Sequence, residues 1–434
     1  MNVNVHSDLF SPLDYANVPR ANGLANKVDK DDRMFHEWYR FVLSFPPHLV
    51  RDYINKFRLK KDQTILDPFC GTGTTIVESK LQRINSIGIE PNPIAHFASC
   101  VKCDWSIDPD ALVKHADYIA ACVKKKINSS EPGSLRKLPS DSEDLLLTDS
   151  ISPLPLHKAL ILLGQINNGT GLPFYNHELL ALAKALVFSI SNLHFGPEVG
   201  VHRNKKSDAP VVESWLSEIN IMARDIYRAD QNYTYSIVHK ADSRQVSSLL
   251  EPNSIDAVFT SPPYPNEKDY TRTTRLESVI LGFINNKQEL QSLKRTLLRS
   301  NTRNVYKGDD DDIWVAQHAE IQRIADEIEN KRISLGKTSG FEKLYGKVTK
   351  LYFGGMARHL AELRTFLKPG AYLGYVVGDQ ASYLQILIKT GELLADIAQS
   401  LGYEVVSLDL FRTRLATATR KQLREEVVVL RWPG

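Results

Sequence analysis

The stretch that decides the fold is QTILDPFCGTGTTIVESKLQRINSIGIEPNP (Gln63–Pro93). Its first apolar and β-branched residues, Thr64–Leu66, predict a buried strand. A glycine loop, Asp67–Thr74, comes next, and the spacing then predicts a helix over Thr75–Leu81 and a second strand over Ser86–Ile89. This order is a βαβ unit whose loop lies at the carboxyl end of the first strand, the edge at which parallel sheets bind ligands.

The glycine loop indicates what kind of ligand this edge binds. Gly71 and Gly73 allow the backbone to turn tightly and a ligand to approach closely. Glu90 ends the second predicted strand, where a carboxylate can accept hydrogen bonds from both hydroxyls of a ribose. The helix N-terminus at Thr74–Thr75 is electropositive and suits a carboxylate as well as a phosphate. The third glycine of the dinucleotide signature and the Gly-Lys-Ser/Thr of a P-loop are both missing, so we expect a nucleoside ligand without a pyrophosphate.

A second stretch, SIDAVFTSPPY, combines a short buried strand with an abrupt end. IDAVFT is apolar and β-branched, and Pro262 and Pro263 cannot continue a central strand because neither has a backbone N–H. Taken alone, this SPPY segment (Ser261–Tyr264) is most simply a turn that ends a strand.

Composition sets limits on the class of protein. The chain has 434 residues, 42% hydrophobic and 24% charged, which is ordinary globular composition, and a formal net charge of only +3. A nucleic-acid partner must therefore be argued from local basic patches. The first residues show no signal peptide, the longest apolar runs are too short for a membrane span, and four cysteines indicate a reducing compartment; we expect a cytoplasmic, nucleoid-associated protein with no membrane partner. Cys100 and Cys103 form one isolated C-x-x-C, which does not predict a zinc site, and we expect no metal.

Strands and helices alternate along most of the chain. Helical periodicity runs over Ala111–Ile127, His177–Asn192 and Val211–Arg228, strand signals resume at TYSIVHKAD and SIDAVFT, and helices follow to about Leu367. The C-terminal part reads as strand, helix, strand and a final strand, EEVVVLRW. About seven strands in this order predict an α/β fold with a doubly wound, seven-stranded, mostly parallel sheet and two helical insertions.

Together, DPFCGTGTT and TSPPY resemble the motifs of the DNA amino-methyltransferases, which transfer a methyl group from S-adenosyl-L-methionine (AdoMet) to the exocyclic amino group of a base. The resemblance extends over about Phe35–Val101 and Tyr233–Gly434 and implies the class I, Rossmann-like methyltransferase fold. SFPPHLVRDYI is similar to the family segment that packs against the methionine part of AdoMet, and HKADSRQVSSL to the element whose acid, here Asp242, reaches the adenine. The cofactor residues that the resemblance implies are Asp67, Pro68, Phe69, Cys70, Gly71, Thr72, Gly73, Thr74, Thr75, Glu90, Pro91, Asp242 and Ser261.

The resemblance gives the SPPY segment a catalytic role, carried by Ser261, Pro262, Pro263 and Tyr264. The lone pair of an exocyclic amine is drawn into the ring, so two acceptors for its N–H groups, the Ser261 hydroxyl and the Pro262 carbonyl, would move it toward tetrahedral geometry. The prolines fix φ, and Tyr264 offers a flat face on which a base rotated out of the duplex can stack.

The target base and the class of nucleic acid stay open. Ser at the first position of this motif is commoner in enzymes that make N4-methylcytosine, and Asp or Asn in those that make N6-methyladenine, so cytosine is our first expectation and adenine the alternative. The cofactor motif precedes SPPY here, whereas many members with Ser have the reverse order, which weakens the choice. An RNA base methyltransferase would share every motif, and a non-catalytic AdoMet-sensing DNA-binding protein is a further alternative. The partners implied are double-stranded DNA and a cognate restriction endonuclease.

The domain division follows from these assignments. We expect an N-terminal arm (1–34), a catalytic domain formed by 35–104, 231–270 and 343–434, a helical insertion (105–230), and a second insertion (271–342) that is the candidate target-recognition region. Basic residues in SLKRTLLRSNTRNVYKG (Ser292–Gly308), in the expected hairpin FRTRLATATRKQLR (Phe411–Arg424) and in VHRNKK are candidates for phosphate contacts. The expected DNA-binding residues are Lys294, Arg295, Arg299, Arg303, Arg412 and Arg414. The acidic run Asp309–Asp312 argues mildly against the first patch or caps the helix after it.

Overall fold

The computed structural model describes residues 26–41, 44–129, 131, 133–196, 198–229, 234–266, 268–415 and 422–434. Most of the predicted N-terminal arm (1–34), residues 230–233 at the border of the first insertion, and Arg420 and Lys421 of the predicted hairpin lie outside these ranges.

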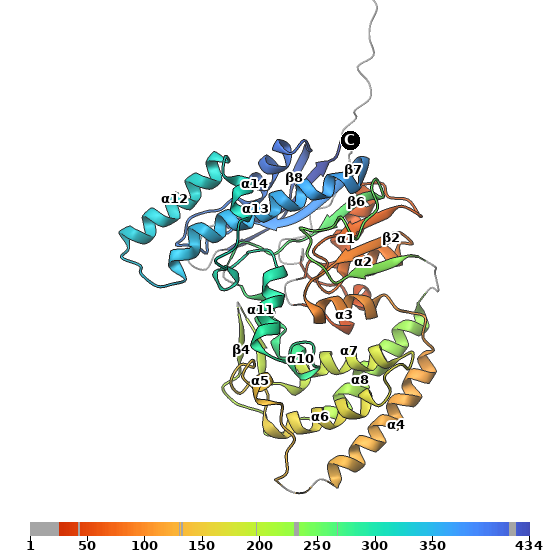
Figure 1. Ribbon diagram of the computed structural model, residues 1–434. Helices are drawn as coiled ribbons and strands as arrows, with labels where there is room; N and C mark the ends of the chain where they lie inside the picture. The colour runs from red at the N-terminus through yellow and green to blue at the C-terminus, as the bar shows by residue number, and fades with distance from the viewer. Residues whose placement is uncertain are drawn as a thin grey trace, which may run out of the picture.

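A seven-stranded sheet with the order β5-β2-β1-β6-β7-β9-β8 forms the centre of the molecule (Figure 1). The five strands from β5 to β7 are parallel to one another, and β9 is antiparallel to both β7 and β8. The strands are β1 (Thr64–Asp67), β2 (Asn85–Ile89), β5 (Ser236–His239), β6 (Ile255–Thr260), β7 (Leu367–Gly378), β8 (Glu404–Leu415) and β9 (Gln422–Arg431). The predicted α/β fold with a mostly parallel seven-stranded sheet is confirmed, and it is the arrangement of a class I methyltransferase.

Helices cover both faces of the sheet, because the central strands are buried on both sides. Ile65 packs toward one face with Phe259, while Leu66 and Val258 pack toward the other. The first face is covered by α1 (Pro47–Lys56), and the second by α13 (Tyr345–Leu363) and α14 (Thr390–Ser400). The two helices next to the glycine loop are α2 (Thr74–Leu81) and α3 (Pro93–Lys102).

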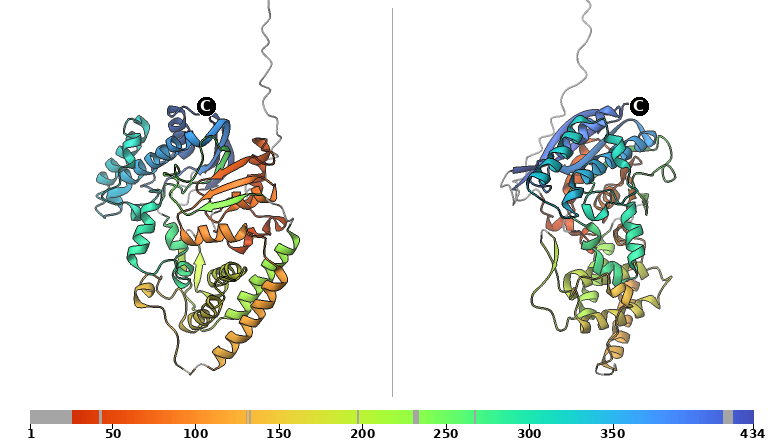
Figure 2. Two further views of the ribbon diagram at one scale, coloured as in Figure 1. Left: turned by 45° about the vertical axis from the view of Figure 1, so that its right-hand side comes forward. Right: turned by 60° about the vertical axis from the view of Figure 1, so that its left-hand side comes forward.

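The first insertion is a group of helices at the end of the molecule opposite α13 and α14 (Figures 1 and 2). Its helices are α4 (Pro109–Asn128), α5 (Ser140–Glu143), α6 (Pro153–Asn167), α7 (Tyr175–Ala185) and α8 (Val211–Arg228). Phe35 stacks on Trp105 with ring centroids 4.2 Å apart, and Trp38 Nε1 donates to Asp225 of α8 at 2.9 Å. The insertion therefore shares one hydrophobic core with α3 and with the segment that precedes α1.

The helices of the second insertion pack against two different parts of the molecule. Its helices are α9 (Tyr270–Thr273), α10 (Arg275–Ile280), α11 (Lys287–Thr296) and α12 (Ala319–Ser334). α10 packs against α3 and α5, whereas α12 pairs with α13. Between them, buried Asp311 is salt-bridged to Arg244 and to Arg358 of α13. Asp311 of the acidic run that follows the first basic patch is thus paired inside the protein.

Two details of the first insertion differ from the expectation. The predicted helix His177–Asn192 is α7 followed by one π-helical turn, Leu186–Ile190. The Gly/Pro segment after it forms a hairpin of β3 (Leu193–Phe195) and β4 (Val199–Val201), which was not predicted because each strand has only three residues. At the C-terminal end, the last two strands extend into the predicted hairpin Phe411–Arg424. Arg412 and Arg414 lie within β8, and Arg424 lies within β9.

Candidate active site

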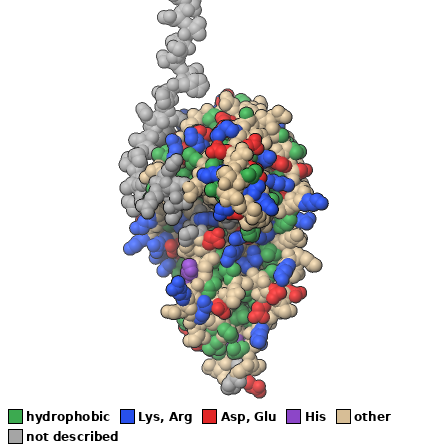
Figure 3. Space-filling view, turned by 90° about the vertical axis from the view of Figure 1, so that its left-hand side faces the viewer, with side chains coloured by type: hydrophobic (Ala, Val, Ile, Leu, Met, Phe, Trp, Pro, Cys, Tyr) green, Lys and Arg blue, Asp and Glu red, His purple; other side chains and the backbone are tan. Residues whose placement is uncertain are grey.

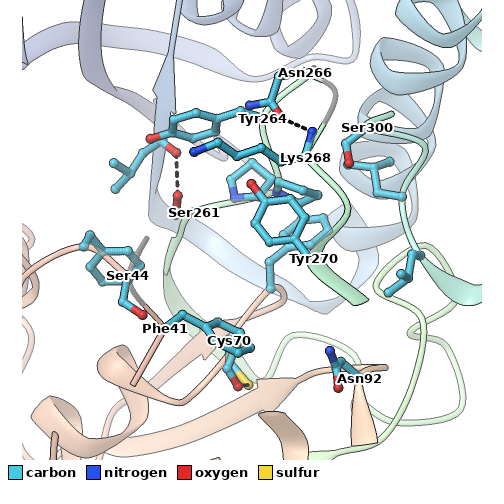
Figure 4. A pocket seen from close by; sticks show the side chains of 18 of the residues that line it. Phe41, Ser44, Cys70, Asn92, Ser261, Tyr264, Asn266, Lys268, Tyr270 and Ser300 are labelled. Atoms are coloured by element: carbon cyan, nitrogen blue, oxygen red, sulfur yellow. Dashed lines mark hydrogen bonds between the residues drawn. The ribbon is translucent and has the colours of Figure 1, made fainter. Parts of the chain in front are cut away.

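A cavity of about 610 Å³ opens at the carboxyl ends of β1, β2 and β6, where the glycine loop and the SPPY segment meet. Side chains from the segment before α1, from the second insertion and from β7, β8 and β9 complete its walls (Figure 4). The predicted site residues that line it are Phe69, Cys70, Gly71, Thr72, Thr74, Glu90, Pro91, Ser261, Pro262, Pro263 and Tyr264. Asp67, Pro68, Gly73, Thr75 and Asp242, also predicted, are not among the lining residues.

Asp67 joins the glycine loop to the SPPY segment from behind. Its buried Oδ1 accepts hydrogen bonds from the Thr260 hydroxyl at 2.5 Å and from the Phe69 amide at 3.2 Å. Burial raises the pKa of Asp67 to about 6, and the bond from Thr260 opposes that shift. Because Thr260 is the last residue of β6, the ends of β1 and β6 are held in register.

The glycine loop needs glycine for two different reasons. Gly71 and Gly73 have φ of +52° and +80°, in the left-handed region that other residues avoid. A Cβ on Gly73 would also lie 2.8 Å from the Ser99 hydroxyl oxygen, so no side chain fits there. Two side chains of α3 fix the carbonyls of the loop: the Ser99 hydroxyl donates to the Gly71 carbonyl at 2.8 Å, and the buried Lys102 ammonium donates to the Thr72 carbonyl at 2.6 Å.

Glu90 fixes the far side of the loop. Its buried carboxylate accepts from the Gly71 amide at 2.9 Å and from the Asn92 amide at 2.8 Å, and it lines the cavity. Burial raises the pKa of Glu90 to about 7, while the two amide bonds act in the opposite direction. The carboxylate is therefore oriented toward the loop before any ligand arrives.

The SPPY segment presents acceptors to the cavity. The Ser261 hydroxyl donates to the carbonyl of Val376 in β7 at 3.0 Å (Figure 4), and the Tyr264 hydroxyl is a second neighbour of its oxygen. The bond to Val376 commits the proton of Ser261, so its oxygen can act towards the cavity as an acceptor. Within the described part of the chain, no hydrogen bond to the Pro262 carbonyl is recorded. One side-chain oxygen and one backbone oxygen are thus held ready to accept on a rigid turn.

Aromatic side chains stand next to these acceptors. Tyr264 lies half-buried with its ring against Gly378, where a Cβ would be 3.1 Å from the tyrosine Cε2. Tyr270 of α9 also points into the cavity (Figure 4). Together they give the cavity a flat apolar wall that suits a planar ring.

Asp242 is not among the residues that line the cavity. Its carboxylate is bonded by the guanidinium of Arg244, with Nη2 at 2.6 Å and Nε at 3.0 Å from its two oxygens. The neighbouring Ser243 lines the cavity instead. The salt bridge fixes the loop after β5, and the contact of Asp242 with a bound adenine stays a prediction.

The predicted phosphate contacts separate into buried and available residues. Arg299 is buried, forms a bidentate salt bridge with Asp309 at 2.8 Å, and donates to three backbone carbonyls, so it is withdrawn from the DNA-binding set. Lys294 is salt-bridged to buried Asp269 at 2.8 Å. Arg295 and Arg303 are exposed. The Arg295 guanidinium lies over the ring of Tyr306, and the Arg303 guanidinium lies over the ring of Phe341.

Arg412 and Arg414 line the cavity itself, where both contact Glu425 of β9. A space-filling view of this side shows Lys and Arg side chains around the waist between the sheet and the first insertion (Figure 3). Glu198, in the unpredicted β3–β4 hairpin, also reaches the cavity.

Several lining residues were not singled out from the sequence. Asn266, Lys268 and Tyr270 follow the SPPY segment within ten residues, so their nearness in sequence was a usable signal. Asn92, directly after Glu90 and Pro91, was another. Other lining residues come from distant elements and carry no motif: Glu198, Ser300, Asn304, Gln380, Ser382 and Glu425.

Two other structural findings concern metals and membranes. Among the described residues, Asp29, Asp32 and His48 are near enough to share an ion, but Asp32 is already salt-bridged to Arg51 at 2.7 Å. Cys100 lies in α3 and Cys103 caps its C-terminus. No helix in the described ranges has the length and apolar character needed to cross a bilayer.

Comparison with known proteins agrees with this geometry. Residues 14–96, which include the glycine loop and Glu90, match the N6/N4 methyltransferase family model, described as DNA methylase. These similarities support a DNA methyltransferase that acts on an amino group. The methyltransferase is 25% identical to the Type II methyltransferase M.BsoBI of Geobacillus stearothermophilus over 448 residues, covering 92% of this chain and 84% of the relative. It is 23% identical to the Type II methyltransferase M.AvaI of Nostoc sp. PCC 7120, covering 92% of this chain and 86% of that protein.

Proposed function

We propose that the methyltransferase transfers a methyl group from AdoMet to the exocyclic amino group of a base flipped out of double-stranded DNA, and that this base is cytosine, modified at N4. The observation that carries the proposal is the Ser261 hydroxyl, whose proton is donated to Val376 at 3.0 Å, beside the Pro262 carbonyl, which accepts no backbone hydrogen bond from the described residues. Two fixed acceptors on one rigid turn suit an –NH₂ group.

The residues around the glycine loop fit AdoMet. Gly71 leaves the backbone open to the cavity, and the buried Thr72 hydroxyl oxygen has no hydrogen-bond partner among the described residues. We expect the Glu90 carboxylate to accept from the ribose hydroxyls. Phe45, from the segment that resembles the methionine-packing element, and Phe41, three residues before that segment, line the same cavity and would cover the aliphatic part. The bound cofactor supplies an electrophilic methyl group on a sulfonium.

The protein's own groups act on the base. Ser261 Oγ and the Pro262 carbonyl would accept hydrogen bonds from the two N–H groups of the amine, which would turn its lone pair from the ring toward the bound methyl group. Transfer would place a positive charge on the nitrogen, stabilised by the same two acceptors until the nitrogen gives up one proton to water. Tyr264 supports the ring by stacking, and the fixed φ of the two prolines removes an ordering cost at the moment of reaction.

Cytosine is preferred over adenine because Ser, and not Asp or Asn, stands at the first motif position. We further propose that 271–342, with exposed Arg295 and Arg303, contacts DNA, and that the enzyme works in the bacterial cytoplasm beside a cognate endonuclease, in line with its Type II relatives.

Substrate class is tested by methyl transfer in vitro. Purified enzyme is incubated with labelled AdoMet and either PCR-amplified, unmethylated genomic DNA or RNA transcribed from the same templates. We expect label in DNA and none in RNA, and about 10–1000-fold slower labelling of DNA with Ser261→Ala. Label confined to RNA would support the RNA methyltransferase alternative and contradict the proposal.

A further inference from the structure

Lys268 lines the cavity near the SPPY segment, and neither sequence motif gives this lysine a role. It lies four residues after Tyr264, and its backbone is fixed on both sides: its amide donates to Asn266 Oδ1 at 2.9 Å, and its carbonyl accepts from Asn301 Nδ2 at 3.0 Å. Figure 4 shows its side chain running across the cavity from this anchored backbone, with the ammonium on the side where Ser261 and Tyr264 lie.

In the described part of the chain, no carboxylate lies within salt-bridge distance of the Lys268 ammonium. The two carboxylates that act on it electrostatically, Glu425 and Glu198, are paired with other residues. Glu425 contacts Arg412 and Arg414, and Glu198 contacts Arg272 at 3.6 Å. Burial lowers the pKa of Lys268, helped by Arg414 and opposed by Glu425 and Glu198.

A half-buried lysine without a partner is unfavourable unless a ligand supplies acceptors. Lys294, close by in the second insertion, shows the structural alternative, since it is paired with Asp269 at 2.8 Å. Lys268 is not used in this way, so the arrangement indicates a group kept for the substrate.

We propose that the Lys268 ammonium recognises the flipped base by donating hydrogen bonds to N3 and O2 of cytosine. The proposal rests on the proposed function, because it takes the amine to be held by Ser261 and Pro262. The pairing edge of cytosine presents a donor at N4 and then two acceptors, N3 and O2. The acceptors of the SPPY segment followed by two N–H donors of Lys268 reproduce the acceptor–donor–donor order with which guanine pairs.

Adenine offers a poorer match to the same edge. After its N6 donor it presents one acceptor, N1, and then a C–H, so the second ammonium N–H would stay without a partner in a desolvated site. Donation to N3 has a second effect, because it occupies the ring lone pair that would otherwise compete with the amine for the methyl group. Lys268 thus contributes both to base choice and to the site of methylation.

The test compares Lys268→Met, which keeps an unbranched chain of similar length, with Lys124→Met as matched control. Lys124 is exposed on α4 of the first insertion, where it contacts Glu213 of α8 at 2.9 Å, away from the cavity and from the proposed DNA-contacting segment. Single-turnover methylation is measured on a duplex whose target base, located by sequencing, is cytosine or 3-deazacytosine, in which N3 is replaced by C–H. AdoMet affinity and melting temperature are measured on all proteins.

We expect Lys268→Met to lower the rate on cytosine by about 10–100-fold, with AdoMet affinity within about twofold of wild type. On 3-deazacytosine the wild type should already be slow, and Lys268→Met should cost less than about threefold more, because the contact is absent. The preference of the variant for cytosine over adenine in otherwise identical duplexes should fall about tenfold. Lys124→Met should behave as wild type.

An equal loss on cytosine and 3-deazacytosine would assign Lys268 to phosphate binding or to the fold and overturn the inference, and so would an unchanged rate on cytosine. Failure of the proposed function is distinguishable, since it would appear as a wild-type enzyme that methylates no DNA base. A wild type that makes only N6-methyladenine would overturn the assignment of Lys268 to N3 and O2 of cytosine while leaving amino-methylation intact.

Discussion

Replacing Ser261 with Ala removes one of the two acceptors that the mechanism requires. In the unliganded enzyme the change deletes the bond to Val376 at 3.0 Å, a neutral hydrogen bond with a net contribution of about 1 kcal/mol. In the transition state the amine N–H carries growing positive charge, so its bond to Oγ is worth more, about 1.5–4 kcal/mol. At 1.36 kcal/mol per factor of ten, turnover should fall about 10–1000-fold.

Single-turnover methyl transfer, AdoMet affinity by calorimetry and melting temperature should be measured on the same preparation. Affinity should change less than about twofold, because the predicted cofactor contacts of Glu90 and the glycine loop are untouched. Ser400→Ala removes a hydroxyl that also donates to a backbone carbonyl, that of Ile397 at 2.7 Å in α14 outside the cavity, and is the matched control, with activity near wild type. A Ser261→Ala enzyme with wild-type turnover would refute the acceptor role. Joint loss of melting temperature and AdoMet affinity would show that the segment only ends a strand.

Four other changes have defined outcomes. Glu90→Gln should weaken AdoMet binding by about 1–3 kcal/mol and abolish its pH dependence: in the wild type the raised pKa, about 7, makes affinity fall as pH drops below 7, which calorimetry between pH 5.5 and 8 would check. Lys102 has a folded pKa lowered to about 7 from 10.5, so wild-type stability should decline as pH falls from 10.5 toward 7 and then level off; thermal melts of Lys102→Met should show a flatter profile, and equal slopes would contradict the burial cost. Arg295→Gln with Arg303→Gln should weaken binding to all duplexes and reduce the salt slope by about one unit per lost contact; an unchanged slope in a filter-binding titration would mean that these side chains are merely solvated. Tyr264→Ala should raise KM for DNA by the equivalent of about 1–3 kcal/mol, while Tyr264→Phe keeps most activity; equal KM values for the two variants would argue against stacking.

The fold was largely predictable because its signals are local. The strand, glycine loop and helix of Thr64–Leu81 follow from apolar periodicity and from glycine, and the structure places them within one residue of the prediction. The end of β6 at Thr260 follows equally from the two prolines after it. The β3–β4 hairpin had no comparable signal, since strands of three residues are too short for a period of two to stand out.

The site was predictable in its backbone motifs and less so in its charged residues. Glu90 lines the cavity because it directly follows β2, and the carboxyl ends of parallel strands face the ligand site. Asp242 and Arg299 are each salt-bridged, Asp242 to Arg244 two residues further on and Arg299 to Asp309 ten residues further on, and their sequence pattern did not show that these pairs form. A sequence shows that a charge is present but not which partner it has, so Lys268, for which the described residues offer no salt-bridge partner, could be recognised only in the structure.

The central claim is that the cavity between the glycine loop and the SPPY segment methylates the amino group of cytosine in DNA. The most direct measurement is mass spectrometry of nucleosides from the DNA of cells that express the chain, compared with cells that express Ser261→Ala. The account predicts N4-methylcytosine with the wild type and a strong reduction with the variant. N6-methyladenine alone would contradict the choice of base, and the absence of any methylated base while purified protein still binds AdoMet would contradict the claim itself.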